Sequence, residues 1–482
     1  MTLDPQDWSV VRATGHRMVD DMLDWQQSVR ERAPWQPVPD DVKSRIDEPV
    51  PFSGMPLDQV YAAFLRDVLP YPTGNIHPRF WGWVMGTGTP TGMLAEMLAT
   101  GMNPHLAGYD QAASLIEKKV ISWLKSLMGF PETASGLLVS GGTAANLNGL
   151  LAARVGKAGW DVREEGLYAG PPLVVYGSTE THSWAGQACE TMGLGRKGFR
   201  KITADSQYRL DIDACRAAIM ADLDDGKRPI AIVGNAGTVN TAAVDDLKAI
   251  RALSDEFGLW FHVDGAFGSM AAWCESRDLV AGQELADSIG FDLHKWGYMP
   301  YEVGVVLTRD PDAQLAAFQT QAGSAAYLQS SQKGISADAT HFADRGLQLT
   351  RGFRALKVWM SMKEQGVDRI GAAIQANIEQ ARYLAERVEV TATLELLAPV
   401  SMNIVCFRYA PGGLTTERLN LLNQAILTAL QVRGVAVPSQ TILDGRFAIR
   451  VCVTNHRSEL SDFDALVDAV VAIGAELASE LK

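Results

Sequence analysis

One lysine in this sequence stands where its amine could act as a nucleophile. Lys295 closes the run Phe-Asp-Leu-His-Lys that begins at Phe291, and it lies between His294 and Trp296. Most lysines are solvated surface residues, and Lys295 taken alone could be one of these. A lysine in a partly dry pocket, however, has a lowered pKa and can form a Schiff base with a carbonyl group. Lys295 is therefore a candidate for covalent catalysis.

Three further signals suit the same chemistry. The run Ser-Gly-Gly-Thr-Ala-Ala-Asn at residues 140–146 follows an apolar run and opens a helical pattern, so its N–H groups and the Thr143 hydroxyl could face a phosphate. A glycine turn with Thr143 as an ordinary N-cap fits equally well. Asp264 ends an apolar run and could hold a proton on a heteroaromatic nitrogen, or merely form a turn. His182 follows another apolar run, where a lone histidine is usually structural.

Together these four signals describe what one cofactor requires. A phosphate cradle, an acid for a ring nitrogen, an imidazole for a ring face and a lysine for a Schiff base are the groups that bind pyridoxal 5′-phosphate. A nucleotide-binding α/β protein with a phosphate at residues 140–143 remains an alternative, although the run matches neither the dinucleotide fingerprint nor the P-loop.

The order and spacing of these residues resemble the aspartate-aminotransferase-like fold (fold type I) of pyridoxal phosphate enzymes. More narrowly, the chain from about residue 57 onward resembles the group II pyridoxal-dependent decarboxylases, which include aromatic-L-amino-acid, tyrosine, glutamate and histidine decarboxylases. The shared motifs are His77-Pro78-Arg79-Phe80, Gly237-Thr238, His262-Val263-Asp264, His294-Lys295-Trp296 and the run from Arg351 to Lys357.

The resemblance implies a role for each matching residue. Lys295 would carry the cofactor as an internal aldimine, His182 would stack on its ring, and Asp264 would keep the ring nitrogen protonated. Tyr327, in the Gly- and Ser-rich stretch 322–340, matches a lid tyrosine that protonates the quinonoid at Cα. The remaining cofactor positions are Gly142, Thr143 and His294 at the phosphate, and Thr238 and Ala266 at the ring.

The implied reaction is decarboxylation of an L-amino acid to the primary amine and CO2. Related aldehyde synthases have Phe in place of the lid tyrosine, so Tyr327 favours simple decarboxylation. The alternatives on the same scaffold are an aldehyde synthase, an aminotransferase or a carbon–carbon lyase. A catalytically silent pyridoxal-binding protein is a more distant alternative.

The substrate-binding residues are the least determined part of this interpretation. The resemblance places Trp83, Met85, His105 and Arg351 near the substrate, although a structural salt bridge is an equally good role for Arg351. The segments Trp83–Gly86 and Met102–His105 differ from those of the aromatic branch: Asn103 and His105 make the predicted pocket more polar, while Trp83 keeps one apolar wall. Asp292-Leu293 also replaces the Asn-Pro of that branch. Both an aromatic and a polar or acidic amino acid therefore remain open.

These residues need a scaffold that brings them to one edge. Short apolar runs at 136–139, 173–176, 230–233, 259–263 and 303–307 alternate with helical patterns such as 143–155 and 245–257. This alternation predicts a mostly parallel sheet covered by helices, with the site at the carboxyl ends of the strands. We expect an N-terminal arm at 1–108, a large cofactor domain at 109–369 and a small α+β domain at 370–482.

Composition excludes several other classes of protein. The 482 residues are 47% hydrophobic and carry a net charge of −13, which disfavours nucleic acid and anionic membranes. Apolar stretches are too short for a membrane span, the first residues do not resemble a signal peptide, and five scattered cysteines have no metal-type spacing. We therefore expect a cytoplasmic protein without a metal. The resemblance implies a homodimer with shared active sites, in which the N-terminal arm would embrace the partner subunit.

Overall fold

The computed structural model describes residues 2–319, 334–336 and 341–480, and it consists of two compact units. The first unit contains Met1–Trp83, Tyr383–Leu397 and Phe407–Lys482, and the second contains Val84–Arg382 and Ala398–Cys406. The N-terminal and C-terminal segments, which the sequence treats as two separate parts ending at residue 108 and beginning at residue 370, thus belong largely to one unit.

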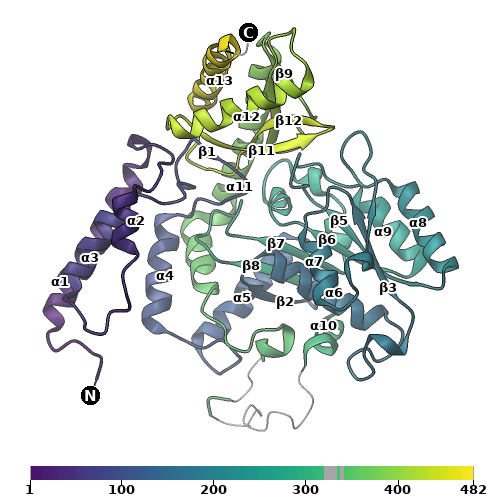
Figure 1. The fold of residues 1–482 in the computed structure, drawn as a ribbon. Helices are drawn as coiled ribbons and strands as arrows, with labels where there is room; N and C mark the ends of the chain where they lie inside the picture. Colours follow the sequence, from purple (N-terminus) through teal and green to yellow (C-terminus); the bar gives the residue numbers. More distant parts are fainter. Residues whose placement is uncertain (1, 320–333, 337–340, 481–482) are drawn as a thin grey trace. The chain divides into compact units, whose positions relative to one another are not determined.

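The second unit is an α/β unit built on a seven-stranded sheet (Figure 1). Its strands are β2 (Ser135–Val139), β3 (Leu173–Ser178), β4 (Phe199–Ile202), β5 (Arg228–Asn235), β6 (Trp260–Asp264), β7 (Ser288–Asp292) and β8 (Gly304–Thr308). Its helices are α4 (Pro90–Met102), α5 (Ala112–Leu127), α6 (Gly142–Lys157), α7 (Trp184–Thr191), α8 (Ile212–Asp224), α9 (Leu247–Phe257) and α10 (Pro311–Phe318). A longer helix, α11 (Ala355–Glu389), is interrupted at Gly366 and runs on into the first unit.

The strand order is β2-β8-β7-β6-β5-β3-β4. The strands from β7 to β4 all run parallel, while β8 is antiparallel to both of its neighbours. The predicted mostly parallel sheet is therefore confirmed, as are the strands expected at the five apolar runs. Two strands, β4 and β7, were not predicted.

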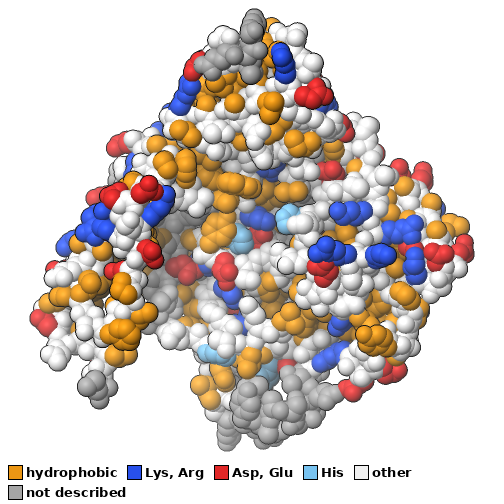
Figure 2. All heavy atoms as spheres, viewed as in Figure 1, with side chains coloured by type: hydrophobic (Ala, Val, Ile, Leu, Met, Phe, Trp, Pro, Cys, Tyr) orange, Lys and Arg blue, Asp and Glu red, His pale blue; other side chains and the backbone are white. Residues whose placement is uncertain are grey.

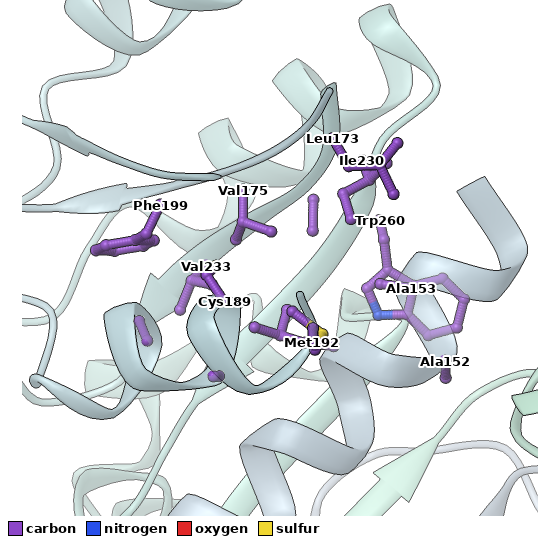
Figure 3. Close-up of a cluster of buried hydrophobic side chains, with 14 of the residues drawn as sticks. Ala152, Ala153, Leu173, Val175, Cys189, Met192, Phe199, Ile230, Val233 and Trp260 are labelled. Carbon is purple, nitrogen blue, oxygen red and sulfur yellow. The ribbon is translucent and has the colours of Figure 1, made fainter. Parts of the chain in front are cut away.

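Successive side chains of β6 point to opposite faces of the sheet, and each face packs against a layer of helices. Trp260 joins the buried cluster beneath α6 and α7 (Figure 3), and His262 on the same face bonds Asn146 of α6 (3.0 Å). Phe261, on the opposite face, lies beside Gly234, where α9 contacts the sheet. Burial lowers the pKa of His262 to about 4, so the imidazole is a neutral core group at pH 7. A strand buried on both faces needs this near-continuous apolar sequence.

The first unit is an α+β unit with a five-stranded sheet of order β1-β11-β12-β10-β9. Residue Phe80 of the N-terminal segment pairs with Val437 in parallel, and Trp81 stacks on Phe463 with ring centroids 4.8 Å apart. The strands are β1 (Phe80–Trp81), β9 (Leu394–Leu396), β10 (Ile404–Tyr409), β11 (Val437–Leu443) and β12 (Arg446–Cys452). The helices are α1 (Trp8–Gln27), α2 (Asp40–Ile46), α3 (Leu57–Ala63), α12 (Thr416–Val432) and α13 (Leu460–Glu480).

Two features of the described residues bear on contact with a membrane: the surface charge and the apolarity of the helices. Acidic and basic side chains lie interspersed on the face seen in Figure 2. Among the described residues, no helix has both the length and the apolarity that crossing a membrane requires.

Candidate active site

The carboxyl ends of the parallel strands in the second unit meet at one edge of the sheet. Because β8 runs backward between β2 and β7, its first residue, Gly304, pairs with the last residue of each, Val139 and Asp292. In the next strands, Asp264 at the end of β6 pairs with Asn235 at the end of β5. The loops that carry the predicted cofactor-binding residues therefore all begin at this edge.

Asp264 is buried and held in place by two donors. Its Oδ2 accepts a hydrogen bond from Trp184 Nε1 (2.5 Å), and its Oδ1 accepts one from the backbone N–H of Ala266 (3.1 Å). Trp184 is the first residue of α7, and its own backbone N–H donates to Nδ1 of His182 (3.2 Å). A single tryptophan thus orients both the acid and the imidazole, a role that its place in the Thr-His-Ser-Trp run did not reveal.

The pKa of His182 depends on the charges of both Asp264 and Lys295. Although the residue is exposed, the protein atoms around the ring lower its pKa by desolvation, and the positive charge of Lys295 lowers it further, while Asp264 acts in the opposite direction. We expect the ring to be neutral at pH 7. A neutral imidazole that solvent can reach is able to stack on an aromatic ring.

The N-terminus of α6 forms a glycine cradle. The helix begins at Gly142, and no side chain of the described residues caps its first N–H groups. A Cβ on Gly142 would lie 2.9 Å from Asp292 Oδ2, and one on Gly304 would lie 2.6 Å from the Cα of Gly141. Thr143 is exposed as the second residue of the helix rather than its N-cap. Uncapped N–H groups at the start of a 16-residue helix suit an anion such as phosphate.

Lys295 lies in an ion pair rather than alone in a dry pocket. Its Nζ is 2.9 Å from Oδ2 of Asp292, whose side chain is 1% exposed. Burial lowers the pKa of Lys295, but the charge and hydrogen bond of Asp292, with a contribution from Asp264, more than compensate, so the pKa is raised. The lowered pKa expected from the sequence is therefore wrong, because the carboxylate of Asp292, three residues earlier, stabilises the ammonium form of Lys295.

His294 anchors the loop that carries Lys295. Its Nδ1 lies 3.1 Å from both the backbone oxygen and the backbone nitrogen of Val303, and its ring lies 4.6 Å from the ring of Tyr301. Burial lowers the pKa of His294. A Cβ on Gly141 would approach His294 Cε1 at 3.3 Å. The imidazole is therefore adjacent to the glycine cradle, as the phosphate assignment requires.

Thr238 and Ala266 lie on the loops that follow β5 and β6. The Thr238 hydroxyl is buried, accepts from the backbone N–H of Ala243 (3.1 Å) and lies 3.2 Å from the Thr241 hydroxyl. The carbonyl oxygen of Ala266 accepts from the backbone N–H of Asp292 (3.0 Å), and its Cβ lies 3.6 Å from the position of a Cβ on Gly142. Ala266 is thus next to the cradle, whereas Thr238 is engaged in its own loop.

The predicted substrate residues have separate surroundings. Met85 precedes Gly86, whose backbone lies against the carbonyl oxygens of His294 and Lys295, so Met85 is beside the lysine loop. His105 accepts from the backbone N–H of Ala107 (3.3 Å) through its own Nδ1 and contacts the ring of Tyr109. Trp83 belongs to the first unit, and its side chain is exposed. The lid tyrosine Tyr327 lies outside the described residues.

Arg351 is fully buried and makes structural contacts. Its guanidinium donates to the carbonyl oxygens of Leu106 (3.0 Å) and Leu138 (2.7 Å) and forms an ion pair with Glu117, which is equally buried. Burial raises the pKa of Glu117, and the positive charge of Arg351 opposes that shift. These contacts favour the salt-bridge alternative over a substrate role.

We expect replacement of Arg351 by methionine to destabilise the fold by about 3–5 kcal/mol, because it leaves the Glu117 carboxylate buried without a counter-charge. Denaturant unfolding of the full chain measures this loss. The control is Arg433→Met, which breaks an exposed pair with Glu476 (2.8 Å) and should leave the midpoint nearly unchanged. Unchanged stability together with a raised KM in Arg351→Met would restore the substrate role.

A pocket of about 320 Å³ opens beside the lysine loop in the second unit. It shares Tyr301 with the surroundings of His294. Its polar lining consists of Glu96, Thr100, Asn103, Tyr301, Glu302, Arg354 and Lys357. Of the segment 102–105, the pocket includes Asn103 and Pro104 but not His105. This lining contains side chains of both signs of charge.

The residues at this edge fit pyridoxal 5′-phosphate. The N–H groups of α6 suit its phosphate, a buried carboxylate suits its ring nitrogen, and the amine of Lys295 suits its aldehyde. A family model described as the pyridoxal-dependent decarboxylase conserved domain matches residues 39–410. The chain belongs to the pyridoxal-dependent decarboxylase family.

The alignments with individual relatives cover most of this decarboxylase. An aromatic-L-amino-acid decarboxylase of Bacillus atrophaeus is 31% identical over 476 residues, which cover 97% of this chain and 96% of that protein. An L-2,4-diaminobutyrate decarboxylase of Rhizobium meliloti is 31% identical over 434 residues, covering 89% and 84%. The crystal structure of Oryza sativa TDC with PLP and tryptamine matches with a TM-score of 0.90 at 26% identity, covering 99% and 100%.

Membership confirms the fold type I prediction and the cofactor, pyridoxal 5′-phosphate. The enzyme class is that of the amino-acid decarboxylases, which are carboxy-lyases. The substrate does not follow from membership, since the two relatives named above act on an aromatic and on a diamino acid.

Proposed function

We propose that this decarboxylase converts an L-amino acid to the primary amine and CO2, with Lys295, Asp264 and His182 as the catalytic residues that contact the cofactor. The observation that carries the proposal is geometric: Trp184 donates hydrogen bonds to both Asp264 and His182, and the loop of Lys295 begins at the same edge of the sheet as that of Asp264. The charge of Asp264 also favours the ammonium form of Lys295. These contacts support one site formed by the loops that follow three different strands.

Pyridoxal phosphate supplies an aldehyde for amines and a ring that withdraws the electron pair left at Cα when CO2 departs. The protein provides the environment for this chemistry. The N–H groups of α6 at Gly142 and Thr143 would hold the phosphate, and His294 would border it. Asp264, fixed by Trp184, would keep a proton on the ring nitrogen, and the Lys295 amine would bind the aldehyde.

We further propose that Tyr327 delivers the proton to Cα of the substrate after CO2 has left. Replacement by phenylalanine is expected to lower kcat for amine formation by about 10²–10⁴-fold, since the general acid is lost. Aldehyde and hydrogen peroxide should then rise relative to amine, because an unprotonated carbanion remains available to oxygen.

The experiment measures CO2, amine, aldehyde and peroxide from a panel of aromatic, acidic and basic amino acids. Amine and CO2 in equal amounts are expected from the unaltered enzyme. The matched control is Tyr168→Phe, at a fully exposed tyrosine, which should leave the product ratio unchanged. Aldehyde and peroxide as the main products of the unaltered enzyme would instead support the aldehyde-synthase alternative.

The substrate class stays open between aromatic and polar amino acids. The charged pocket beside Tyr301 supports a polar side chain, while Met85 next to the lysine loop supports an apolar one. The same amino-acid panel distinguishes the two.

We also propose that the enzyme is a cytoplasmic homodimer with shared active sites. Large apolar side chains of the N-terminal segment support an interface, since Leu3, Trp8, Val50 and Phe52 are all exposed. Light scattering of the holoenzyme at micromolar concentration tests the dimer, and a monomer would refute it.

A further inference from the structure

Asp292 occupies the space between two glycines at the edge of the sheet. It is the last residue of β7, and its backbone N–H donates to the carbonyl oxygen of Ala266 (3.0 Å). Its Oδ2 lies 2.9 Å from the position of a Cβ on Gly142, and its Oδ1 lies 2.9 Å from that of a Cβ on Gly304. The carboxylate therefore lies in the glycine cradle at the N-terminus of α6.

The two carboxylate oxygens have different partners. Oδ2 forms the ion pair with Lys295 Nζ at 2.9 Å, whereas Oδ1 is buried and has no hydrogen-bond partner among the described residues. His294 Nε2 is 3.8 Å from Oδ2, but burial lowers the pKa of this histidine and keeps it neutral at pH 7. Lys295 and the N-terminal dipole of α6 are thus the positive groups that offset the Asp292 charge.

This arrangement opposes cofactor capture in two ways. A phosphate dianion at the start of α6 would stand beside a carboxylate, which like-charge repulsion disfavours. The amine of Lys295 must also be neutral to attack an aldehyde, and an adjacent carboxylate favours the ammonium form. Asp292 therefore stabilises the cofactor-free state of the site.

We propose that Asp292 is a positioning residue that holds the Lys295 amino group at the N-terminus of α6 until pyridoxal phosphate arrives, so that cofactor capture must break the Asp292–Lys295 ion pair. This inference rests on the proposed function, in which Lys295 is the attachment point. Overall, the ammonium nitrogen and the aldehyde carbon form a C=N bond, the aldehyde oxygen leaves as water with two of the nitrogen's protons, and the third proton stays on nitrogen.

The pH dependence of capture follows from the groups around the pair. Burial lowers the pKa of Lys295, and Asp292, Asp264 and Tyr301 raise it to a net value above its ordinary one. His294 is neutral, and the β8 and α6 residues nearest to Asp292, Gly304 and Gly142, carry no titratable side chain. The reactive neutral amine is therefore scarce at pH 7, and its fraction should keep increasing up to the highest pH at which the protein is stable.

The test uses the full chain after removal of its cofactor with hydroxylamine. Pyridoxal 5′-phosphate is then added by stopped flow between pH 6.5 and 10, and the absorbance near ~420 nm reports the C=N bond to lysine. Borohydride reduction and peptide mass analysis identify the lysine that is modified. For the unaltered chain, the capture rate should rise across the whole range without a plateau below pH 9.

Asp292→Asn should capture the cofactor about tenfold faster at pH 7, with its pH profile shifted down by roughly one unit, since each unit of pKa is a factor of ten in neutral amine. Asp292→Glu keeps the charge and should restore the steep profile of the unaltered chain. The matched control is Asp222→Asn, which removes a buried carboxylate 2.8 Å from Lys227 outside the site and should leave the profile unchanged.

Three results would overturn the inference. Two of them concern Asp292→Asn: an unchanged pH profile, or slower capture of the cofactor. The third is a plateau of the capture rate below pH 9 in the unaltered chain, a measurement that does not depend on the folding of any variant. Failure of the proposed function looks different. In that case borohydride would attach the cofactor to a lysine other than Lys295, whatever the effect of Asp292.

Discussion

Replacing Lys295 with alanine is expected to remove the absorbance near ~420 nm and to lower kcat by at least about 10³-fold, because the covalent attachment point of the cofactor is lost. The change also leaves the Asp292 carboxylate without the ammonium that lies 2.9 Å away. Spectroscopy of the purified enzyme after incubation with pyridoxal phosphate, together with amine formation, measures both effects.

A suitable control removes another lysine that is paired with a buried aspartate. Lys227→Ala breaks a contact of 2.8 Å with Asp222, in the loop between α8 and β5. The absorbance and kcat of this variant should remain close to those of the unaltered enzyme. An undiminished 420 nm band in Lys295→Ala would contradict the assignment of the attachment lysine.

Asp264→Asn is expected to reduce kcat by about 10²–10³-fold while the cofactor still binds covalently, because the amide keeps the size of the side chain but not its negative charge. Without that charge the ring nitrogen is not held protonated, and the ring withdraws electrons less well. An amide oxygen can still accept the hydrogen bond that Trp184 Nε1 donates to the carboxylate over 2.5 Å, so the fold should persist.

A second variant separates charge from orientation. Trp184→Phe removes the hydrogen bond to Asp264 but keeps the charge, and a loss of kcat smaller than that of Asp264→Asn is expected. The cofactor absorbance verifies that both variants are loaded. Equal losses in the two variants would mean that orientation, rather than charge, is the contribution of Asp264.

The sequence predicted the parts of the fold that depend on local apolar patterns. Strands β5 and β6 were found because both are buried on two faces and are therefore almost continuously apolar. Strand β4 was missed because Phe-Arg-Lys-Ile is a partly exposed edge strand with two charges. Strand β7 was missed because its centre is Gly290, where a Cβ would lie 2.1 Å from Asn146 Oδ1. Tertiary contact with α6, rather than strand propensity, determines that residue.

The candidate site divides in a similar way. Lys295, Asp264 and His182 were predicted as site residues because each stands in a recognisable sequence motif. Asp292 and Trp184 were missed because their importance depends on which atoms they contact, and a short motif does not contain that information. Arg351 was found by its motif, but its burial against Glu117 is a property of the folded chain alone.

The first unit consists of three segments that are far apart in the sequence, and this affects the order in which its parts are synthesised. Phe80 emerges early in synthesis, but its strand partner Val437 follows only after the whole of the second unit. Until then, the first 83 residues lack the sheet and the aromatic partner of Trp81. The N-terminal segment therefore cannot complete its sheet while the second unit is being made, and its apolar side chains stay uncovered during that time. Ribosome-bound chains that end before β11 should accordingly be far more sensitive to protease in this segment than in the second unit.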